Sequence, residues 1–410
     1  MAQRGDFASV AAEPHNPMWR DCVKREKEIY SRGDDIRTEF ARDYNRILHS
    51  TAYRRLKHKT QVFFATKNDH ICTRIEHVNH VQSISYTIAC ALGLNVDLTM
   101  AIAIGHDIGH APFGHKGESV LKELASTHSL KEFWHERNSL RFADDIETLP
   151  DTSNQLRNLS LTYAVRDGLI CHCGEVDENG IRPREDLVAL ETLEAPGQLQ
   201  AATWEGCVVK LTDKIAYLGR DIEDAIELHV LRWPDLRSLQ AILREHDFKN
   251  IKSINNTVLI HEFVIDVCRR SSPEAGICLS PEHFELMKQI KEFNYERIYG
   301  HPRLETYKKY VELVLGSIFS ELRTSFDKGW RPWLPRLTRQ RAPSLYSAFG
   351  DWLIKYGDAP PDLRHRRRYQ NWVIYQLDSQ ESYLQAVIDF MAGMTDDFAL
   401  RAFAELTSFS

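Results

Sequence analysis

Apolar residues recur at three- and four-residue steps through most of this sequence, in long stretches that glycine and proline seldom interrupt. There are 20 glycines and 15 prolines in 410 residues, and the stretches between them favour leucine, alanine, glutamate, arginine and lysine. This spacing is typical of amphipathic helices, and these residue types have high helix propensity. The pattern therefore predicts an all-α fold in which several helices share one core.

Helices are predicted wherever the apolar spacing is sustained. The expected ranges are about 34–56, 74–92, 98–108, 153–171, 204–229, 254–270, 281–294 and 303–326. The segment 98–108 is almost wholly apolar, which predicts a buried helix, and we expect Gly109 and Pro112 to end it. The short aromatic and β-branched segment Gln61–Phe64 favours a small strand or an extended turn.

A change of composition divides the sequence near its C-terminal end. Residues 330–343 contain three prolines and four arginines, too irregular for a helix. We therefore expect a linker there, between a helical core at 34–329 and a C-terminal helical region at 344–410 that packs on the core. Residues 1–33 are expected to form a separate N-terminal segment.

Charge and cysteine content narrow the classes of protein. The net charge of −6 excludes a global basic field, so any contact with nucleic acid must be local. No apolar segment approaches the roughly 20 residues that span a bilayer, and 1–17 lacks a signal-peptide pattern, which predicts a cytoplasmic protein without membrane contact. The eight cysteines are spread thinly through the chain and are expected to be reduced thiols.

Histidine is concentrated in one part of the chain. Six of the 18 histidines lie within residues 70–118, namely His70, His77, His80, His106, His110 and His115. The adjacent His106 and Asp107 lie on the predicted buried helix 98–108, where an unpaired charge costs several kcal/mol. Binding of a metal ion would stabilise the pair. His77 and Asp213, on the preceding and a later helix, would complete a shell of two histidines and two aspartates.

A shell of nitrogen and carboxylate donors suits manganese, iron, cobalt, nickel or zinc, and magnesium is also compatible. Two other interpretations stay open for the same residues. The pair could be a hydrogen-bonded structural pair without metal. His106 and His110, spaced as in a zincin helix, could instead form half of a zinc site, but the glutamate that such a site needs beside the first histidine is Asp107 here.

Two weaker patterns lie outside this cluster. Cys171-His172-Cys173-Gly174-Glu175 contains closely spaced thiols, but no second cysteine pair has zinc-ribbon spacing, so packed thiols at a helix end are favoured. Arg364-His365-Arg366-Arg367-Arg368 is a dense basic patch that could contact single-stranded nucleic acid or an effector nucleotide. A solvated helix face or a subunit contact is the favoured interpretation of this patch.

The separated histidine, the His-Asp pair and the distant aspartate resemble the metal ligands of the HD-domain phosphohydrolases. Within that superfamily the sequence most resembles the deoxyguanosine triphosphate triphosphohydrolase (dGTPase) family, which includes broader deoxynucleoside triphosphate triphosphohydrolases. The resemblance runs from about residue 34 to residue 398 and is carried by Phe40–Asp43, Arg46–Ser50, Tyr53–Leu56, Lys59–Phe63, Thr73–His77, Gly105–Glu118, Asp213–Asp224 and Gly393–Asp396. It implies an HD-domain helical bundle with additional C-terminal helices.

The resemblance also implies roles for individual residues. The implied ligands of one divalent ion, with manganese or magnesium favoured, are His77, His106, Asp107 and Asp213. The implied catalytic residues are His115, which would protonate the departing 5′ oxygen, Glu118, which would orient it, and the phosphate-neighbouring His110 and His135. The implied substrate-binding residues are Arg74 and Lys214 for the phosphates, Tyr217 for the sugar, and Gln61 and Asp221 for the 3′ hydroxyl. Structural roles stay open for the three catalytic histidines, for Tyr217 and for Asp221.

The function implied by the resemblance is hydrolysis of dGTP or several dNTPs to deoxynucleoside and tripolyphosphate. A homo-oligomer is implied as well. Alternatives are an HD phosphohydrolase acting on a monophosphate or a guanosine alarmone, and a nucleotide-sensing or single-strand-binding protein with a vestigial site. The sequence leaves base preference open.

Overall fold

The structure is a computed structural model that describes residues 6–29, 34–63, 68, 70–173, 178–246, 256–333 and 342–408. The helices of the first half are α1 (Trp19–Cys22), α2 (Glu39–His49), α3 (Thr51–Arg55), α4 (Arg74–Leu92), α5 (Val96–Gly105), α6 (Gly114–Thr127), α7 (His135–Arg141) and α8 (Tyr163–Cys171). Those of the second half are α9 (Trp204–Glu227), α10 (Trp233–Glu245), α11 (Asn256–Arg270), α12 (Pro281–Asn294), α13 (Pro302–Asp327), α14 (Pro343–Tyr356), α15 (Pro361–Arg366), α16 (Gln380–Ala392) and α17 (Asp396–Thr407).

Four short helical turns and two short strands complete the described part of the chain. The turns are η1 (Leu56–His58), η2 (Phe142–Ile146), η3 (Leu190–Thr192) and η4 (Tyr295–Tyr299). The strands β1 (Thr148–Pro150) and β2 (Leu156–Asn158) pair antiparallel and form the one sheet among the described residues. The all-α prediction is confirmed.

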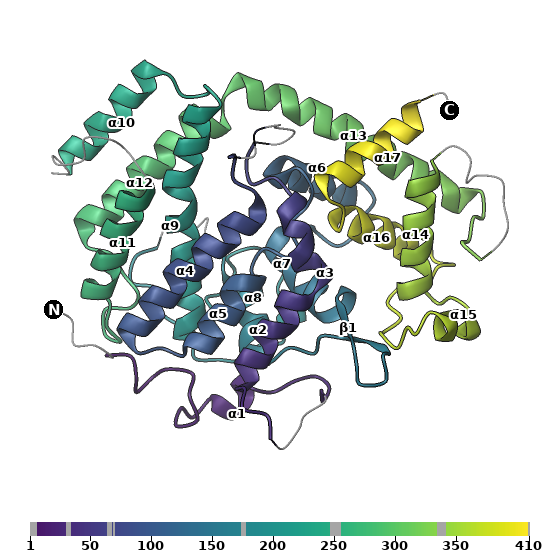
Figure 1. Ribbon diagram of the computed structural model, residues 1–410, viewed down its shortest axis with the longest axis horizontal. Helices are drawn as coiled ribbons and strands as arrows, with labels where there is room; N and C mark the ends of the chain where they lie inside the picture. Colours follow the sequence, from purple (N-terminus) through teal and green to yellow (C-terminus); the bar gives the residue numbers. More distant parts are fainter. Residues whose placement is uncertain are drawn as a thin grey trace.

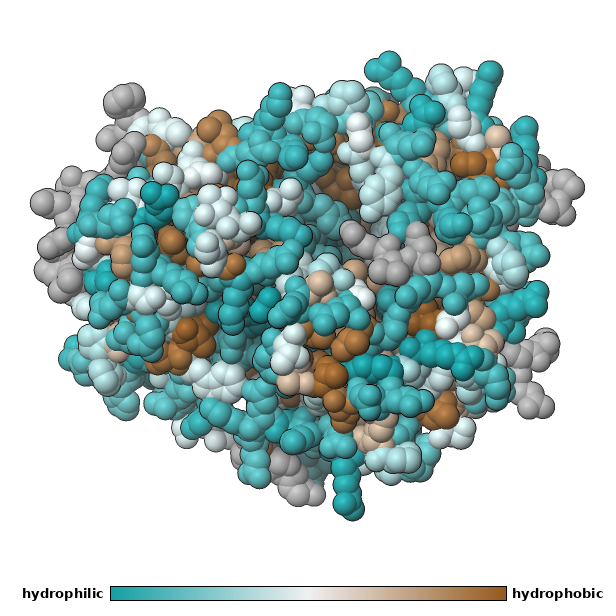
Figure 2. All heavy atoms as spheres, turned by 180° about the vertical axis from the view of Figure 1, so that it is seen from behind, coloured by the Kyte–Doolittle hydropathy of each residue, from teal (hydrophilic) through white to brown (hydrophobic). Residues whose placement is uncertain are grey.

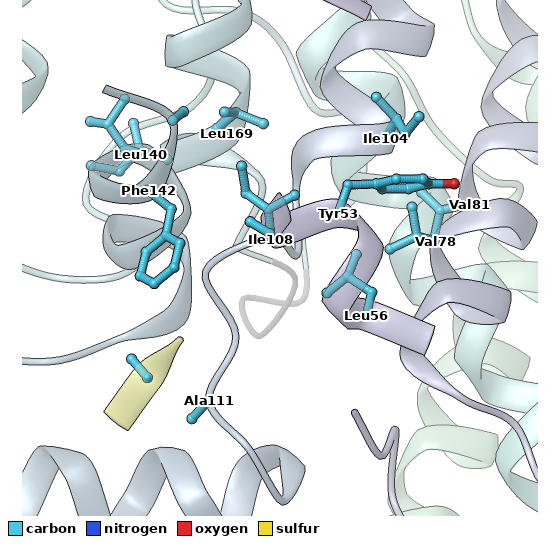
Figure 3. Packing of buried hydrophobic residues seen from close by; sticks show 14 of the residues in the cluster. Tyr53, Leu56, Val78, Val81, Ile104, Ile108, Ala111, Leu140, Phe142 and Leu169 are labelled. Carbon is cyan, nitrogen blue, oxygen red and sulfur yellow. The ribbon is translucent and has the colours of Figure 1, made fainter. Parts of the chain in front are cut away.

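Helix α5 lies in the middle of the bundle and packs against α2, α4, α8 and α9 (Figure 1). It is apolar on all sides, and its residues Ala101 to Ile104 are fully buried. A helix without a polar face is stable only where other helices surround it. Figure 3 shows Ile104 and Ile108, at the end of this segment, within the hydrophobic core. The core therefore fixes the position of the residues that follow α5.

The structure corrects several predicted boundaries. The expected helix at 98–108 ends at Gly105, so His106 and Asp107 lie in a turn rather than on a helix. The expected helix at 34–56 is broken at Ser50, whose extended backbone ends α2 and whose hydroxyl accepts from the amide of Tyr53 to begin α3. The segment expected to be helical at 153–171 begins with β2, and only Tyr163–Cys171 is helical.

The structure also bears on the predicted extended segment at 61–64 and on the predicted C-terminal region. Residues 61–63 form bends, not a strand, and Phe64 lies outside the described residues. The predicted C-terminal helical section consists of the separate helices α14 to α17. Of the expected linker at 330–343, residues 334–341 lie outside the described part, and the proposed domain boundaries stay a prediction.

The C-terminal helices contact the loop that precedes α6. Helices α16 and α17 pack against α13, and α16 also packs against α6. The buried Lys59 donates from Nζ to the carbonyls of His110 and Ala392, which joins this loop to the end of α16. Asp396 accepts hydrogen bonds from the amide and hydroxyl of Thr60, at 3.0 and 2.5 Å, and from the amide of Phe113 at 2.8 Å.

Replacing Asp396 with alanine is expected to lower the free energy of unfolding by about 2–4 kcal/mol, because three donors lose their acceptor in the protein interior. Urea unfolding followed by circular dichroism measures this loss. Asp397→Ala, at the exposed neighbour on the same helix, is the matched control and should change stability by less than about 0.5 kcal/mol. Equal stability of the two variants would contradict the anchoring role of Asp396.

Candidate active site

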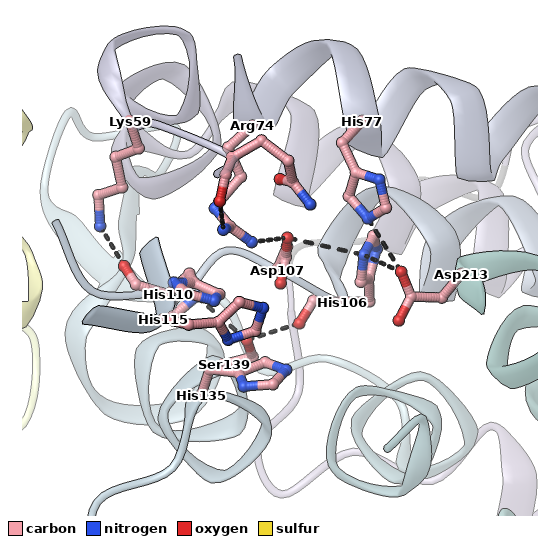
Figure 4. Close-up of polar contacts among 12 residues, drawn as sticks. Lys59, Arg74, His77, His106, Asp107, His110, His115, His135, Ser139 and Asp213 are labelled. Carbon is pink, nitrogen blue, oxygen red and sulfur yellow. Dashed lines mark hydrogen bonds and ion pairs between the residues drawn. The ribbon is translucent and has the colours of Figure 1, made fainter. Parts of the chain in front are cut away.

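Four of the predicted ligand side chains converge at the end of α5. His77 comes from α4 and Asp213 from α9, and their Nε2 and Oδ1 atoms are 2.9 Å apart (Figure 4). The Nε2 atom of His106 lies 3.8 Å from Oδ1 of Asp213 and 3.8 Å from Oδ2 of Asp107. Donor atoms of His77, His106 and Asp213 all lie within 4.8 Å of one another, although His77 and Asp213 are 136 positions apart in the sequence. Asp107 adjoins this group through His106 and is also grouped with His135 and His172.

The tautomer of His106 suits a metal ligand. Its Nδ1 atom donates to the carbonyl of Ala103 at 2.8 Å, which leaves the lone pair on Nε2. This Nε2 atom is buried and has no hydrogen-bond partner in the described protein. Burial lowers the pKa of His106, which favours the neutral ring. A buried nitrogen without a partner beside two carboxylates fits a site for a divalent cation.

Asp107 also forms an ion pair with Arg74, the first residue of α4. Nη1 of Arg74 lies 2.5 Å from Oδ2 of Asp107, and both side chains are buried. Burial alone would raise the pKa of the Asp107 carboxyl, but the Arg74 guanidinium and the neighbouring imidazoles hold it well below its ordinary value. The carboxylate is therefore ionised, as a metal ligand must be.

A second cluster of imidazoles surrounds Glu118 on α6. The Oε2 atom of Glu118 is 3.5 Å from Nδ1 of His115 and 3.8 Å from Nε2 of His110. Its Oε1 atom accepts from the amide of His135 at 2.8 Å and lies 3.1 Å from Nδ1 of the same residue. The side chain of His115 is 63% exposed and points into the cavity mouth, whereas His110 is fully buried and stacks on His135. The four predicted catalytic residues are thus in contact with one another.

The cluster contains imidazoles of opposite character. Burial and the nearby Arg74 lower the pKa of His110 well below its ordinary value, so this ring is neutral. Burial would also lower the pKa of His135, but the charges of Glu136 and Glu118 raise it well above its ordinary value. These two carboxylates therefore favour the protonated form of His135, which lines the cavity.

Most of the predicted residues line one cavity of about 340 Å³. The predicted site residues in its wall are Gln61, Arg74, His77, Asp107, His110, His115, His135, Asp213, Tyr217 and Asp221. His106 and Glu118 lie behind this wall, in contact with residues that form it. Lys214 is the exception, because its side chain is buried and does not line the cavity.

Several residues of this site were not predicted from the sequence. Tyr299 donates to Oδ2 of Asp221 at 2.5 Å, and Lys116, Lys291 and Lys308 also line the cavity. For Lys291, Tyr299 and Lys308 no local signal was available, because their segments contain no recognisable motif. Lys116 lies within the motif Gly105–Glu118 but was assigned no role.

His172 was a different omission. Its ring centroid is 5.1 Å from that of His106, and its Nδ1 atom donates to the carbonyl of Leu169, so that its buried Nε2 has no partner among the described residues. The spacing of Cys171 and Cys173 indicated thiolate chemistry, but the residue of this segment that lies beside His106 is His172.

Asp221 is a candidate for pH-dependent stability. Burial raises the pKa of its carboxyl from 3.8 to about 6, although the hydrogen bond from Tyr299 acts in the opposite direction. The folded protein therefore favours the protonated form, and the contribution to stability is complete below pH 3.8 and is lost as the pH rises through about 6.

Asp221→Asn removes this ionisation and is expected to raise the free energy of unfolding at pH 8 by about 2–3 kcal/mol. The difference from wild type should shrink towards zero near pH 4. Thermal unfolding across this pH range measures it, with Asp362→Asn, at an exposed aspartate, as the control. A constant difference at all pH values would contradict the assignment to the Asp221 carboxyl.

The structure also bears on the weaker patterns. His106 and His110 belong to different clusters in the described chain, which disfavours a zincin-like pair. Cys171 and Cys173 are buried at the end of α8, as expected of packed thiols, while Gly174 and Glu175 lie outside the described residues. None of the eight cysteines, all of which lie in the described ranges, forms a disulfide.

The basic patch at 364–368 is not one exposed face. Arg364 is buried and donates to backbone carbonyls, including that of Asn371 at 2.7 Å, so it has a structural role. Arg366 and Arg367 are exposed and face Asp362 and Asp351. The patch therefore offers fewer cations to a ligand than its sequence indicates.

The surface seen in Figure 2 is mostly hydrophilic, with apolar groups in small scattered areas. None of the helices in the described ranges has both the length and the hydropathy of a membrane-spanning segment.

Known proteins show similarity over most of the chain. Residues 74–218, which contain the four converging His and Asp residues, match the HD domain family. A deoxyguanosinetriphosphate triphosphohydrolase-like protein of Caldanaerobacter subterraneus subsp. tengcongensis is 34% identical over 91% of this chain and 86% of its own length. Proteins of the same description from Desulfatibacillum aliphaticivorans and Rhizobium meliloti are 36% and 32% identical, over 71% and 90% of this chain and 75% and 96% of their own lengths. The protein belongs to the family of deoxyguanosinetriphosphate triphosphohydrolase-like proteins, which is built around an HD domain.

Proposed function

We propose that the protein is a metal-dependent phosphohydrolase that cleaves deoxynucleoside triphosphates to deoxynucleoside and tripolyphosphate. The observation that carries the proposal is the buried, unpartnered Nε2 atom of His106, which faces Asp107 and Asp213 at the wall of the cavity. The family relationship supports phosphohydrolase chemistry.

We propose that His77, His106, Asp107 and Asp213 hold one divalent ion. Bound there, the ion would supply Lewis-acid polarisation of water and of the α-phosphate. Manganese or magnesium suits the donor set best, and iron, cobalt, nickel or zinc would also be accommodated.

The proton for the leaving group is assigned to His115. Its exposed ring lies at the cavity mouth, and Glu118 contacts its Nδ1 atom, so that Nε2 can face the 5′ oxygen of the sugar. The Glu118 carboxylate, 3.5 Å from Nδ1, orients the ring for proton transfer to the leaving group. The positive charge of His135 and the neutral ring of His110 would lie beside the phosphates.

Arg74 is the proposed phosphate ligand with the most favourable position. Three hydrogen bonds, to Asp107 and to the carbonyls of Thr60 and Gln61, occupy part of its guanidinium. Since a guanidinium has five N–H donors, two remain for a phosphate oxygen. A direct contact with Lys214 is proposed only if its side chain moves into the cavity.

The sugar is proposed to lie between Tyr217, Gln61 and Asp221. The hydrogen bond from Tyr299 fixes one oxygen of Asp221, and the other is available to a 3′ hydroxyl. A bulky Tyr217 at the same wall would exclude a 2′ hydroxyl. A site that pairs one hydroxyl and blocks another discriminates strongly between sugars.

The proposal is tested by incubating the protein with each of the four dNTPs, alone and in pairs, with several divalent ions. Phosphorus NMR should show intact tripolyphosphate as the first product. Release of single phosphates, or turnover only of a monophosphate or a guanosine alarmone, would favour the alternative HD phosphohydrolase. Nucleotide or single-strand binding without turnover under any condition would favour a sensing protein.

Several properties stay predictions under this proposal. Activity only with pairs of dNTPs would indicate a nucleotide effector, and turnover of each nucleotide separately would give the base preference. We also expect a homo-oligomer and a cytoplasmic location, where the nucleotide substrates are present.

A further inference from the structure

His172 is a buried imidazole to which the function proposed above assigns no role. It directly follows α8 and lies beside His106, behind the wall of the active-site cavity. Its Nδ1 atom donates to the carbonyl of Leu169 at 2.8 Å, which leaves the lone pair on Nε2. The Nε2 atom is buried, and no N–H or O–H group of the described protein donates to it. Buried acceptors without a donor are rare in folded proteins, so this nitrogen indicates a bound partner.

The surroundings of His172 fit a water molecule as that partner. Side-chain N and O atoms of His172, Asp107 and His135 all lie within 4.8 Å of one another. Two acceptors that share one water are roughly 4.5–5 Å apart, because each hydrogen bond to water is about 2.8 Å long. A water between these residues can donate to Nε2 of His172 and to the Asp107 carboxylate. It then has the two or more polar partners that a buried water requires.

A second metal ion fits this position less well than a water. Nη1 of Arg74 lies 2.5 Å from Oδ2 of Asp107, and both side chains are buried. A positive charge is therefore already paired with the carboxylate of this group. Repulsion between the guanidinium and a further cation opposes binding of the cation, whereas a water molecule is neutral.

The position of His172 relative to His115 suits an in-line displacement. The ring of His135 lies between the two in contact distance, with centroids 6.2 Å from that of His115 and 5.7 Å from that of His172. His115 is exposed at the cavity mouth, whereas His172 is 1% exposed and lies on the interior side of the wall. At phosphorus the attacking and leaving oxygens are roughly in line. A proton donor at the mouth and a water on the interior side meet this requirement.

We propose, on the basis of the function proposed above, that His172 orients the water that attacks the α-phosphorus, by accepting a hydrogen bond from it at Nε2. The oxygen of this water forms the new bond to phosphorus while the bond to the 5′ oxygen breaks. One proton of the water stays on the tripolyphosphate. The other passes to Nε2 of His172, and its later release balances the proton that His115 gives to the 5′ oxygen. The negative charge of a bound triphosphate favours this transient proton on the ring.

Two substitutions separate the roles of the two ring nitrogens. Asparagine places its amide nitrogen near the position of Nδ1, so His172→Asn can retain the hydrogen bond to Leu169 but has no acceptor at Nε2. Glutamine places its amide oxygen near the position of Nε2, so His172→Gln retains an acceptor for the water. A purely structural role predicts the higher activity for His172→Asn. Orientation of the water predicts it for His172→Gln.

Steady-state hydrolysis is measured with the dNTP that wild type cleaves fastest, together with the metal content of each protein. We expect His172→Asn to lower kcat by about 10²-fold with KM and metal content near the wild-type values, and His172→Gln to retain at least about tenfold more kcat than His172→Asn. A kcat of His172→Asn equal to or above that of His172→Gln would overturn the proposal. Loss of metal from either folded variant would also overturn it, because His172 would then act on the ion. Absence of tripolyphosphate with wild type would instead contradict the proposed function.

A measurement on wild type in EDTA tests the hydrogen-bonding state of His172 without metal or turnover. Nitrogen NMR of the ¹⁵N-histidine-labelled protein, with His172 assigned through its connection to Cys171, should show a protonated Nδ1 and an unprotonated Nε2. A proton on Nε2 would overturn the proposal, because this nitrogen could then not accept from a water. The result does not depend on whether either variant folds.

Discussion

Replacing Asp107 with alanine is expected to abolish metal binding and to lower kcat/KM for dGTP by about 10³-fold or more. Asp107 is one of two carboxylates that face the unpartnered Nε2 atom of His106, and it supplies half of the negative charge of the proposed site. Mutation of residues that hydrogen-bond to a metal ligand lowers metal affinity or activity by about 10–100-fold. Loss of a ligand itself is therefore expected to have a larger effect. Metal content of the purified protein and steady-state hydrolysis measure the two losses.

The ion pair with Arg74 complicates this variant and must be controlled. Alanine leaves a buried guanidinium without its partner, which costs about 3–5 kcal/mol. Asp107→Asn retains an oxygen acceptor for Arg74 but removes the charge, so it should fold better and still lose the metal. Asp97→Asn, at the other end of α5 and outside the cavity, should retain both metal and activity. One equivalent of metal in folded Asp107→Asn would contradict the assignment.

Replacing His115 with alanine is expected to lower kcat by about 10²–10⁴-fold while the metal content stays at the wild-type level. The imidazole of His115 is oriented by Glu118 at the cavity mouth, and the residue contacts none of the four proposed ligands in the described structure. The effect should fall on kcat more than on KM, because a proton donor to the leaving group acts in the transition state.

A matched variant at the C-terminal end of the same helix separates this role from a structural one. His128 follows α6 at its far end and lies outside the cavity. His128→Ala should leave kcat close to the wild-type value, because this ring contacts Leu124, Arg323 and Phe319 rather than residues of the cavity. If His115→Ala and His128→Ala had the same activity, or if His115→Ala lost the metal, the proposed division between metal binding and proton transfer would be wrong.

Local signals predicted some helices to the residue. Helix α4 spans the predicted range 74–92 because Thr73 and Glu76 form a capping box at its start and Gly93 adopts the left-handed conformation at its end. Helix α12 likewise begins after Ser280, whose hydroxyl accepts from the amide of His283, and has proline at its first position. Each of these boundaries is determined by residues that lie within a few positions of it in the sequence.

Helices α6 and α7 were not predicted, because the glycines near them are explained by contacts between separate segments rather than by local signals. Glycines at 114 and 117 argue against a helix, yet a Cβ atom at Gly117 would lie 1.7 Å from the carbonyl oxygen of Pro112. The glycine is required by close packing of the loop on the helix, and Gly109 is required in the same way by its approach to the backbone of α7. Sequence periodicity contains no information about such contacts.

The amino-acid sequence by itself determined the chemistry that is present: an apolar segment that must be buried, a His-Asp pair within it, and a second histidine and aspartate on other predicted helices. The tertiary structure alone decided which atoms meet. It placed Nε2 of His106 towards Asp107 and Asp213, brought His172 and Tyr299 to the site, and left Lys214 outside the cavity wall. The physical reason is that propensity and capping act over a few residues, whereas the position of a side chain in the site depends on how helices pack across more than a hundred.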